Sequence, residues 1–146
     1  MTFDELLAFA SRHPMLSGAL VLITLALVYT EIARLLRPFK ALRPAELTAL
    51  VNREDALVVD LSATADFERG HIAGSRNAPA SGFGPEHKLV AGHKERPVVI
   101  VDRTGMASAA AAARLKKAGF ANVYVLDGGI AAWQQADLPL VKGRGK

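Results

Sequence analysis

The sequence predicts an α/β fold in which helices cover both faces of an open parallel sheet, preceded by one N-terminal transmembrane helix. The evidence for the membrane helix is a run of 17 residues without a charge, from Pro14 to Thr30. Beyond residue 44, short apolar segments alternate with helical patterns, and the connections between them are too long for hairpins. The 146 residues suit one domain of about 100 residues and about 40 residues besides.

Composition excludes several classes of protein. The chain has no cysteine, so it forms no disulfide, thiolate nucleophile, persulfide or cysteine-bound zinc site. Hydrophobic residues make up 51% of the chain and charged residues 22%, which excludes a disordered protein. The net charge of +4 comes from a cluster after the apolar run and from a basic tail, residues 142–146, whereas the body between them is nearly neutral. We therefore expect no nucleic-acid partner.

Residues 1–13 form a short amphipathic segment. Thr2 and Glu5 have the spacing of a capping box, which predicts a helix from about residue 2 to residue 11. One face of that helix is apolar and carries Phe3, Leu6, Leu7 and Ala10. Two interpretations remain open for this face: it rests on lipid, or it contacts a partner protein.

Residues 14–36 are predicted to cross a membrane as a single helix. The uncharged run spans about 26 Å at about 1.5 Å per residue, slightly less than a hydrocarbon core of about 30 Å. The apolar pattern continues through Ile32 and Leu35, and Arg34 and Arg37 can extend their side chains to the headgroups. A buried core helix and a helix lying flat on the membrane are disfavoured, because the run shows no polar periodicity. A cleaved signal peptide is disfavoured by the acidic start and by the lack of an Ala-x-Ala site.

Residues 37–43 are expected to be a basic juxtamembrane linker. The C-terminal flank of the apolar run carries four basic residues, whereas the N-terminal flank has Arg12 beside two acids. The positive-inside rule therefore predicts a single-pass protein of a bacterial-type inner (plasma) membrane, with its C-terminal domain in the cytoplasm. The expected partners are the lipid bilayer and a membrane protein.

The body of the chain, residues 44–141, alternates between strand and helix patterns. Its first half predicts a helix from Pro44 to about Val51, a strand at 57–60, a helical turn at 65–69 capped by Thr64 and ended by Gly70, and a weak strand at 75–78. Residues 80–96 carry several glycines and prolines and give no assignment. The second half predicts a buried strand at 97–101, a helix at 106–117, a strand at 123–126, and a turn at Gly128-Gly129 into a short helix with Trp133.

Three of these strands end in a carboxylate, at Asp60, Asp102 and Asp127. Sites in open α/β folds lie at the carboxyl ends of the strands, so these acids could gather around Mg²⁺. Aspartate is also a common turn and cap residue in that position. The pattern alone leaves both interpretations open.

Two motifs in the body resemble the rhodanese-like domain family. The first is Gly70-His71-Ile72-Ala73-Gly74 within 66–79, and the second is Gly128-Gly129-Ile130-Ala131-Ala132-Trp133. The similarity covers about residues 44–141. It implies a rhodanese-like five-stranded parallel sheet flanked by helices. It also implies a site in the loop between a central strand and the next helix, where backbone N–H groups surround a cysteine that carries a persulfide.

The corresponding loop of this chain departs from the family pattern Cys-x-x-Gly-x-Arg/Ser. It consists of Asp102, Arg103, Thr104, Gly105, Met106 and Ala107. Asp102 stands at the cysteine position, and Ala107 stands where many active members carry arginine. A carboxylate cannot form a persulfide, so we expect no sulfurtransferase activity, no catalytic residue, no cofactor and no metal. We expect the Asp102 carboxylate to accept hydrogen bonds from the loop and to act as a built-in anion.

The resulting expectation is a pseudoenzyme that acts as an interaction or scaffold module at the cytoplasmic membrane face. Two alternatives use the same loop. One is an enzyme with Asp102 as phosphoryl nucleophile and Asp60 or Asp127 on Mg²⁺, although the acidic pair and the lysine typical of such sites are missing. The other is a sensor of a small neutral or cationic ligand. His71, Trp133 and Asp60 are expected to be structural.

Overall fold

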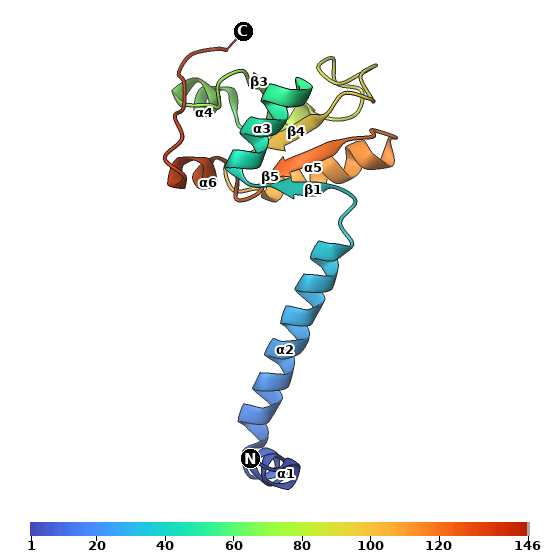
Figure 1. The fold of residues 1–146 in the computed structure, drawn as a ribbon, viewed down its shortest axis with the longest axis vertical. Coiled ribbons are helices and arrows are strands. Elements are labelled where there is room, and N and C mark those ends of the chain that lie inside the picture. The colour runs from blue at the N-terminus through green and yellow to red at the C-terminus, as the bar shows by residue number, and fades with distance from the viewer. Residues whose placement is uncertain (146) are drawn as a thin grey trace. The chain divides into compact units, whose positions relative to one another are not determined.

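The computed structural model describes residues 1–145, so the last residue of the predicted basic tail lies outside the described part. The chain forms two compact units, which divide between Arg37 and Pro38. Figure 1 shows helices alone in the N-terminal unit and a sheet with flanking helices in the other. Each unit is described separately.

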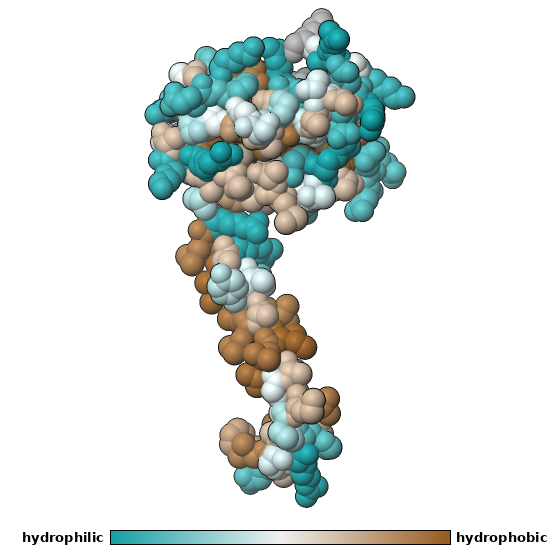
Figure 2. All heavy atoms as spheres, turned by 180° about the vertical axis from the view of Figure 1, so that it is seen from behind, coloured by the Kyte–Doolittle hydropathy of each residue, from teal (hydrophilic) through white to brown (hydrophobic). Residues whose placement is uncertain are grey.

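The N-terminal unit contains α1 (Phe3–Arg12) and α2 (Pro14–Leu35). The predicted capping box is present, because the Thr2 amide donates to the Glu5 carboxylate (2.8 Å) and the Glu5 amide donates to Thr2 Oγ1 (3.4 Å). No residue of α2 is buried, and the space-filling view shows apolar side chains on its surface (Figure 2). By length and composition, α2 is long and apolar enough to cross a membrane.

The second unit is built on a five-stranded, wholly parallel sheet. The spatial order is β1 (Lys40–Leu42), β5 (Val123–Leu126), β4 (Val98–Val101), β2 (Leu57–Asp60) and β3 (Arg76–Asn77). Every residue of β2 and β4 is buried, as expected of central strands covered on both faces. The fold predicted from the sequence is confirmed.

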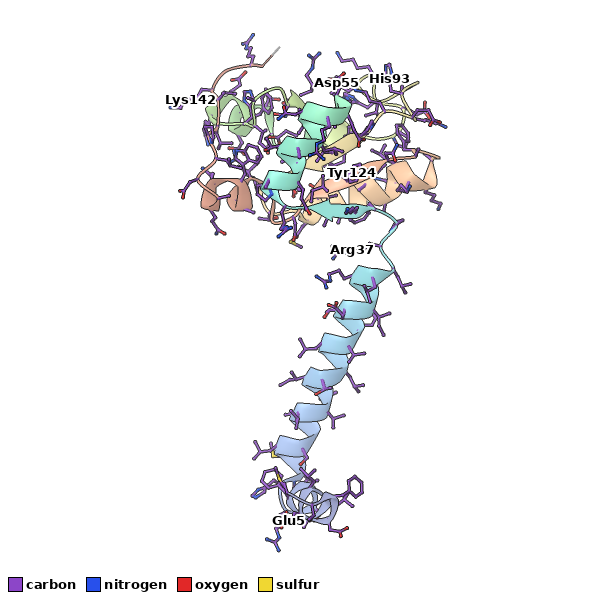
Figure 3. The ribbon with its side chains drawn as sticks, viewed as in Figure 1. Glu5, Arg37, Asp55, His93, Tyr124 and Lys142 are labelled. Carbon is purple, nitrogen blue, oxygen red and sulfur yellow. The ribbon has the colours of Figure 1, made fainter. Side chains whose placement is uncertain are left out.

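Alternate residues of the central strands point to two separate apolar cores. One core contains Val98 and Ile100 of β4 and is covered by α5 (Met106–Lys117), through Leu115 among others. The other contains Val99 and Val101 and is covered by α3 (Pro44–Glu54) and α6 (Gly129–Gln135). Tyr124 of β5 packs at the edge of this second core and lies beneath α3 in Figure 3.

The start of α3 is fixed by a contact of its own first turn. The Arg43 amide donates to the Glu46 carboxylate at 2.8 Å. This hydrogen bond is the main reason that the pKa of Glu46 lies below its ordinary value, and the Arg43 guanidinium adds to the effect. Pro44 occupies the first helical position, where its missing N–H costs nothing.

Two expectations about this unit need correction, and the structure assigns one segment that the sequence left open. Residues 40–42 of the segment expected to be a linker form β1, which pairs with β5. Helix α4 (Thr64–Arg69) begins at Thr64 instead of being capped by it; the cap residue is Ala63, and it makes no side-chain cap bond. The unassigned segment 80–96 contains one 3₁₀ turn, Ala80–Gly82, and otherwise turns. Two of its side chains, Phe83 and Val90, are buried in the core.

Candidate functional site

The loop that the sequence singled out joins the end of β4 to the start of α5. It lies at the carboxyl edge of the parallel sheet, where sites of open α/β folds are found. Asp102 is buried, with 7% of its surface exposed. Arg103, Thr104, Met106 and Ala107 are exposed. The loop therefore presents one buried acid at its base and a surface of mixed side chains.

The Asp102 carboxylate accepts three hydrogen bonds from the residues that follow it. Oδ1 accepts from the Gly105 amide at 2.7 Å and from Ser108 Oγ at 2.5 Å, and Oδ2 accepts from the Ala107 amide at 3.0 Å. The last two donors belong to the first turn of α5. That turn carries unpaired N–H groups and the positive end of the helix dipole. The two amides and the hydroxyl that could donate to an external anion therefore donate to the carboxylate of Asp102.

The start of α6 supports the loop from behind. The Ile130 amide donates to the Asp102 carbonyl at 2.9 Å, and the Ala131 amide donates to the Arg103 carbonyl at 3.2 Å. Gly129 has a φ of +63°, and a Cβ at this position would lie 2.3 Å from the Asp102 carbonyl oxygen. The Gly-Gly motif before Trp133 therefore lets the backbone at the start of α6 approach the backbone of the loop closely.

A side chain of the exposed part of the loop contacts the neighbouring helix α4. Arg103 Nη2 donates to the Asp66 carbonyl in α4 at 2.9 Å, which ties the loop to the neighbouring helix. Met106 is 81% exposed, although it is a large apolar side chain. Thr104 and Ala107 flank it and are exposed too. This surface, Thr104, Met106 and Ala107, is called the loop face below.

The other strand-end carboxylates are not brought into the loop. Asp60 is 1% exposed, and its Oδ1 accepts the Ser62 amide at 2.8 Å, an arrangement typical of an aspartate that stabilises its own turn. Asp127 is exposed. Within residues 1–145, no three His, Cys, Asp or Glu side chains come together as a group that could hold a metal ion. For Asp60, the hydrogen bond to the Ser62 amide favours the turn interpretation.

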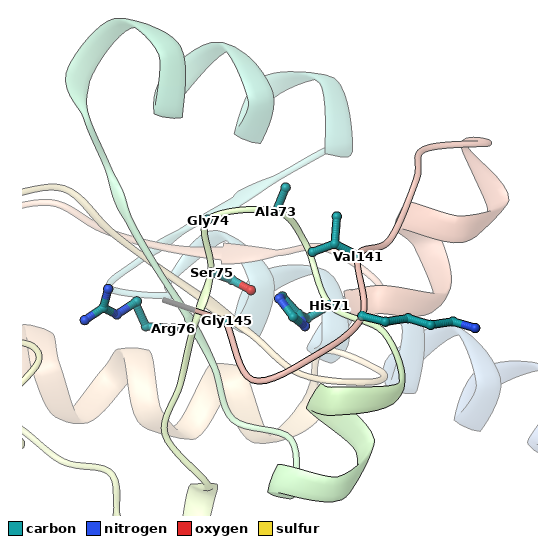
Figure 4. Close-up of a pocket in the computed structure, with 8 residues that line it drawn as sticks. His71, Ala73, Gly74, Ser75, Arg76, Val141 and Gly145 are labelled. Carbon is teal, nitrogen blue, oxygen red and sulfur yellow. The ribbon is translucent and has the colours of Figure 1, made fainter.

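His71 has the surroundings of a structural histidine. Its ring stacks on Phe67 with 3.8 Å between centroids, and Nδ1 donates to the Phe67 carbonyl at 2.8 Å. The ring lines a pocket of about 320 Å³ beside the segment 141–145. The side chain of Arg76, which also lines this pocket, extends away from its centre (Figure 4). Backbone hydrogen bonds between His71 and Val141 close the pocket on one side.

Trp133 is confirmed as a core residue. It is 6% exposed, and its indole Nε1 donates to the Pro139 carbonyl at 3.0 Å.

The sequence did not indicate one residue that contacts Asp102, namely Ser108 in the first turn of α5. This residue lies in a run of alanines and small residues, and its identity as a donor depends on the first turn of α5 facing Asp102. The feature of the sequence that could have indicated its role is that Ser108 is a polar residue among alanines at the start of a helix.

The fold, the position of the loop and its support by a glycine pair together define the class of protein. A family model described as the rhodanese-like domain matches residues 43–136. The chain belongs to the rhodanese-like family.

Two relatives show how far the similarity extends. YibN of Escherichia coli (strain K12) is 42% identical over 97% of this chain and 99% of its own length. GlpE of Pseudoalteromonas translucida, described as a thiosulfate sulfurtransferase, is 34% identical over 67% of this chain and 91% of its own length. The first similarity includes the N-terminal helices, and the second covers a shorter part of the chain.

Solved structures agree with this assignment. A rhodanese-related protein from Thermoplasma volcanium has a TM-score of 0.61 and 25% identity, covering 70% of this chain and 98% of that chain. The family is thus shown independently by the family model, by close relatives and by fold.

Proposed function

We propose that this protein is a non-catalytic rhodanese-like domain that is held at the cytoplasmic face of a membrane by α2 and serves there as a protein-interaction module. The observation that carries the proposal is the Asp102 carboxylate, which occupies the base of the loop and accepts three hydrogen bonds. A carboxylate in this position cannot carry sulfur, and the chain has no cysteine to replace it. Its negative charge also repels thiosulfate.

The loop face supports a role in binding another protein. Met106 is large, apolar and exposed at the first residue of α5, next to a loop whose base is fixed by hydrogen bonds. Methionine is enriched in protein interfaces, and a rigid loop loses little entropy on binding. Membrane anchoring would confine this face to two dimensions and raise its effective concentration for a membrane partner.

A transfer assay with thiosulfate and cyanide tests the loss of catalysis. The wild-type chain is expected to release no thiocyanate above the uncatalysed rate. Asp102→Cys should give little activity, because Ala107 leaves the loop without the arginine of many active members, and Asp102→Cys with Ala107→Arg should give more. Thiocyanate release by the purified wild-type chain would overturn the proposal.

The charge distribution supports the orientation. Four basic residues follow the apolar run, at 34, 37, 40 and 43, and one precedes it. Because the chain has no cysteine, single-cysteine variants can be labelled with a membrane-impermeant maleimide. In intact spheroplasts we expect Asp4→Cys to be labelled and Lys117→Cys to be protected until the membrane is opened. The opposite pattern would place the domain outside.

The interaction role is tested by a photoreactive amino acid at Met106 in native membranes. The matched control places the same amino acid at Lys117, which is exposed at the other end of α5. We expect a discrete crosslinked membrane protein from position 106 and not from position 117. Equal adducts from both positions, or none from 106, would remove the loop face as the binding surface.

A further inference from the structure

The N-terminal helix α1 has one apolar and one polar side, and none of its residues is buried in the described part of the chain. Its apolar side consists of Phe3, Leu6, Leu7, Phe9 and Ala10, and the four large residues among them are between 49% and 74% exposed. The opposite side carries Asp4, Glu5, Ser11 and Arg12. In Figure 3, Glu5 lies on α1 at the far end of α2 from the junction with the sheet unit.

The direction of α1 is set by the junction with α2. Pro14 opens α2 and has no N–H, so it cannot donate to the Ala10 carbonyl and continue α1. His13 between the helices has a non-helical backbone, with φ −130° and ψ 65°. Ser17 Oγ is 3.5 Å from the Ala10 carbonyl oxygen and donates to it in place of the missing amide.

Because the chain changes direction at His13 and Pro14, α1 and α2 do not form one continuous helix. In Figure 1, α1 is seen nearly end-on at the lower end of α2, so α1 turns away from the course of α2. The ring of Phe9 packs against His13, with 4.9 Å between centroids, which adds a side-chain contact to the corner. A helix that turns across the end of a membrane-spanning helix runs along the membrane surface.

We propose that α1 is an interfacial helix that lies in the plane of the bilayer with its apolar side in the lipid. The proposal rests on the proposed membrane anchor, because it is the span of α2 that brings α1 to the interface. The capping box lets α1 satisfy its first amides without a protein partner. Two acids and one basic residue give α1 no cationic side, so lipid binding depends on apolar contact and does not require anionic lipid.

Nitroxide labels on single cysteines test this arrangement in the full chain, reconstituted into phosphatidylcholine nanodiscs. Collisions with O₂ report lipid, and collisions with a nickel chelate report water. We expect a label at Leu7→Cys to contact O₂ severalfold more than the chelate. The matched control, Asp4→Cys on the polar side of the same turn, should show the reverse.

Labels along the apolar side distinguish a helix in the membrane plane from one that crosses it. Phe3→Cys and Ala10→Cys should report the same depth. If α1 instead continued along the axis of α2, their depths would differ by about 10 Å, at about 1.5 Å per residue. Such a difference would overturn the proposal.

A reference label at Ala26→Cys in α2 separates failure of this inference from failure of the anchor. With Ala26 in lipid, a Leu7 label exposed to the chelate would overturn the interfacial helix and leave the anchor standing. A Leu7 label shielded from both reagents would show a protein contact instead and would also overturn it. An Ala26 label exposed to the chelate would remove the anchor and α1's place in the membrane together.

Discussion

The Asp102 carboxylate accepts the hydrogen bonds that hold the base of the loop together. Its two oxygens lie where the first turn of α5 directs an amide and a hydroxyl, and the Gly105 amide adds a third donor. The sequence predicted that this carboxylate would bind the loop amides, and the geometry agrees. It did not predict the Ser108 hydroxyl, because a serine in an alanine-rich helix has no local feature that indicates where it points.

Asp102→Ala should lower the free energy of unfolding by about 1–3 kcal/mol, because it leaves a buried hydroxyl and two amides without an acceptor. Thermal unfolding of the full chain in mild detergent measures the change. Sulfate should raise the melting temperature of this variant and not of the wild type, since only the variant leaves the anion site free.

The control is Asp127→Ala, which removes an exposed carboxylate at the end of the neighbouring strand. It should change stability by less than about 0.5 kcal/mol. If Asp102→Ala behaves like this control and sulfate has no effect on it, the carboxylate does not hold the loop.

Helix α6 holds the loop after β4 through hydrogen bonds between backbone groups alone. Its first two amides that face the loop donate to loop carbonyls, and glycine at position 129 is needed for the approach. The motif was recognised from its residues, but the contact with the Asp102 carbonyl follows only from the parallel order in which β5 lies beside β4.

Gly129→Ala should destabilise the protein by about 2–4 kcal/mol, because its Cβ would clash with the Asp102 carbonyl and its φ is positive. Gly92→Ala is the matched control, since Gly92 also has a positive φ but has open space around its Cβ position. It should cost about 1 kcal/mol. Urea unfolding compares the two variants, and equal losses would mean that backbone conformation alone accounts for the effect.

The strand β1 is the element that the sequence did not predict. Of its three residues, Lys40 and Ala41 are exposed and Leu42 alone is buried, so no alternation marks it as a strand. Its basic neighbours indicate a membrane flank instead. Its conformation comes from pairing with β5, and the edge of an existing sheet imposes such pairing independently of local propensity. The longer apolar strands and α5 carry strong local signals and were predicted within a residue.

At the scale of the whole molecule, a short connection links α2 to the first strand of the sheet. Four residues, 36–39, separate the end of α2 from the start of β1. The sheet unit starts at Pro38, whereas the family resemblance and the family model start at residues 44 and 43. The boundary chosen for a soluble fragment therefore decides whether β1 is included.

A fragment of residues 38–146 should be monomeric and more stable than one of residues 44–146 by about 2–5 kcal/mol, because the shorter one loses the buried Leu42. The shorter fragment also exposes the edge of β5, which favours self-association. Urea unfolding and size-exclusion chromatography measure both effects. Leu42→Ala in the longer fragment should reproduce part of the stability loss without the association. Equal behaviour of the two fragments would show that β1 contributes nothing to the sheet.

The carboxylate at the base of the loop also removes the redox chemistry of a thiolate from that position. Peroxide, nitric oxide donors and alkylating agents attack thiolates and leave carboxylates unchanged. The group of this loop that peroxide can still oxidise is the exposed Met106 side chain, so a partner that recognises the loop would meet a more polar surface under oxidative stress.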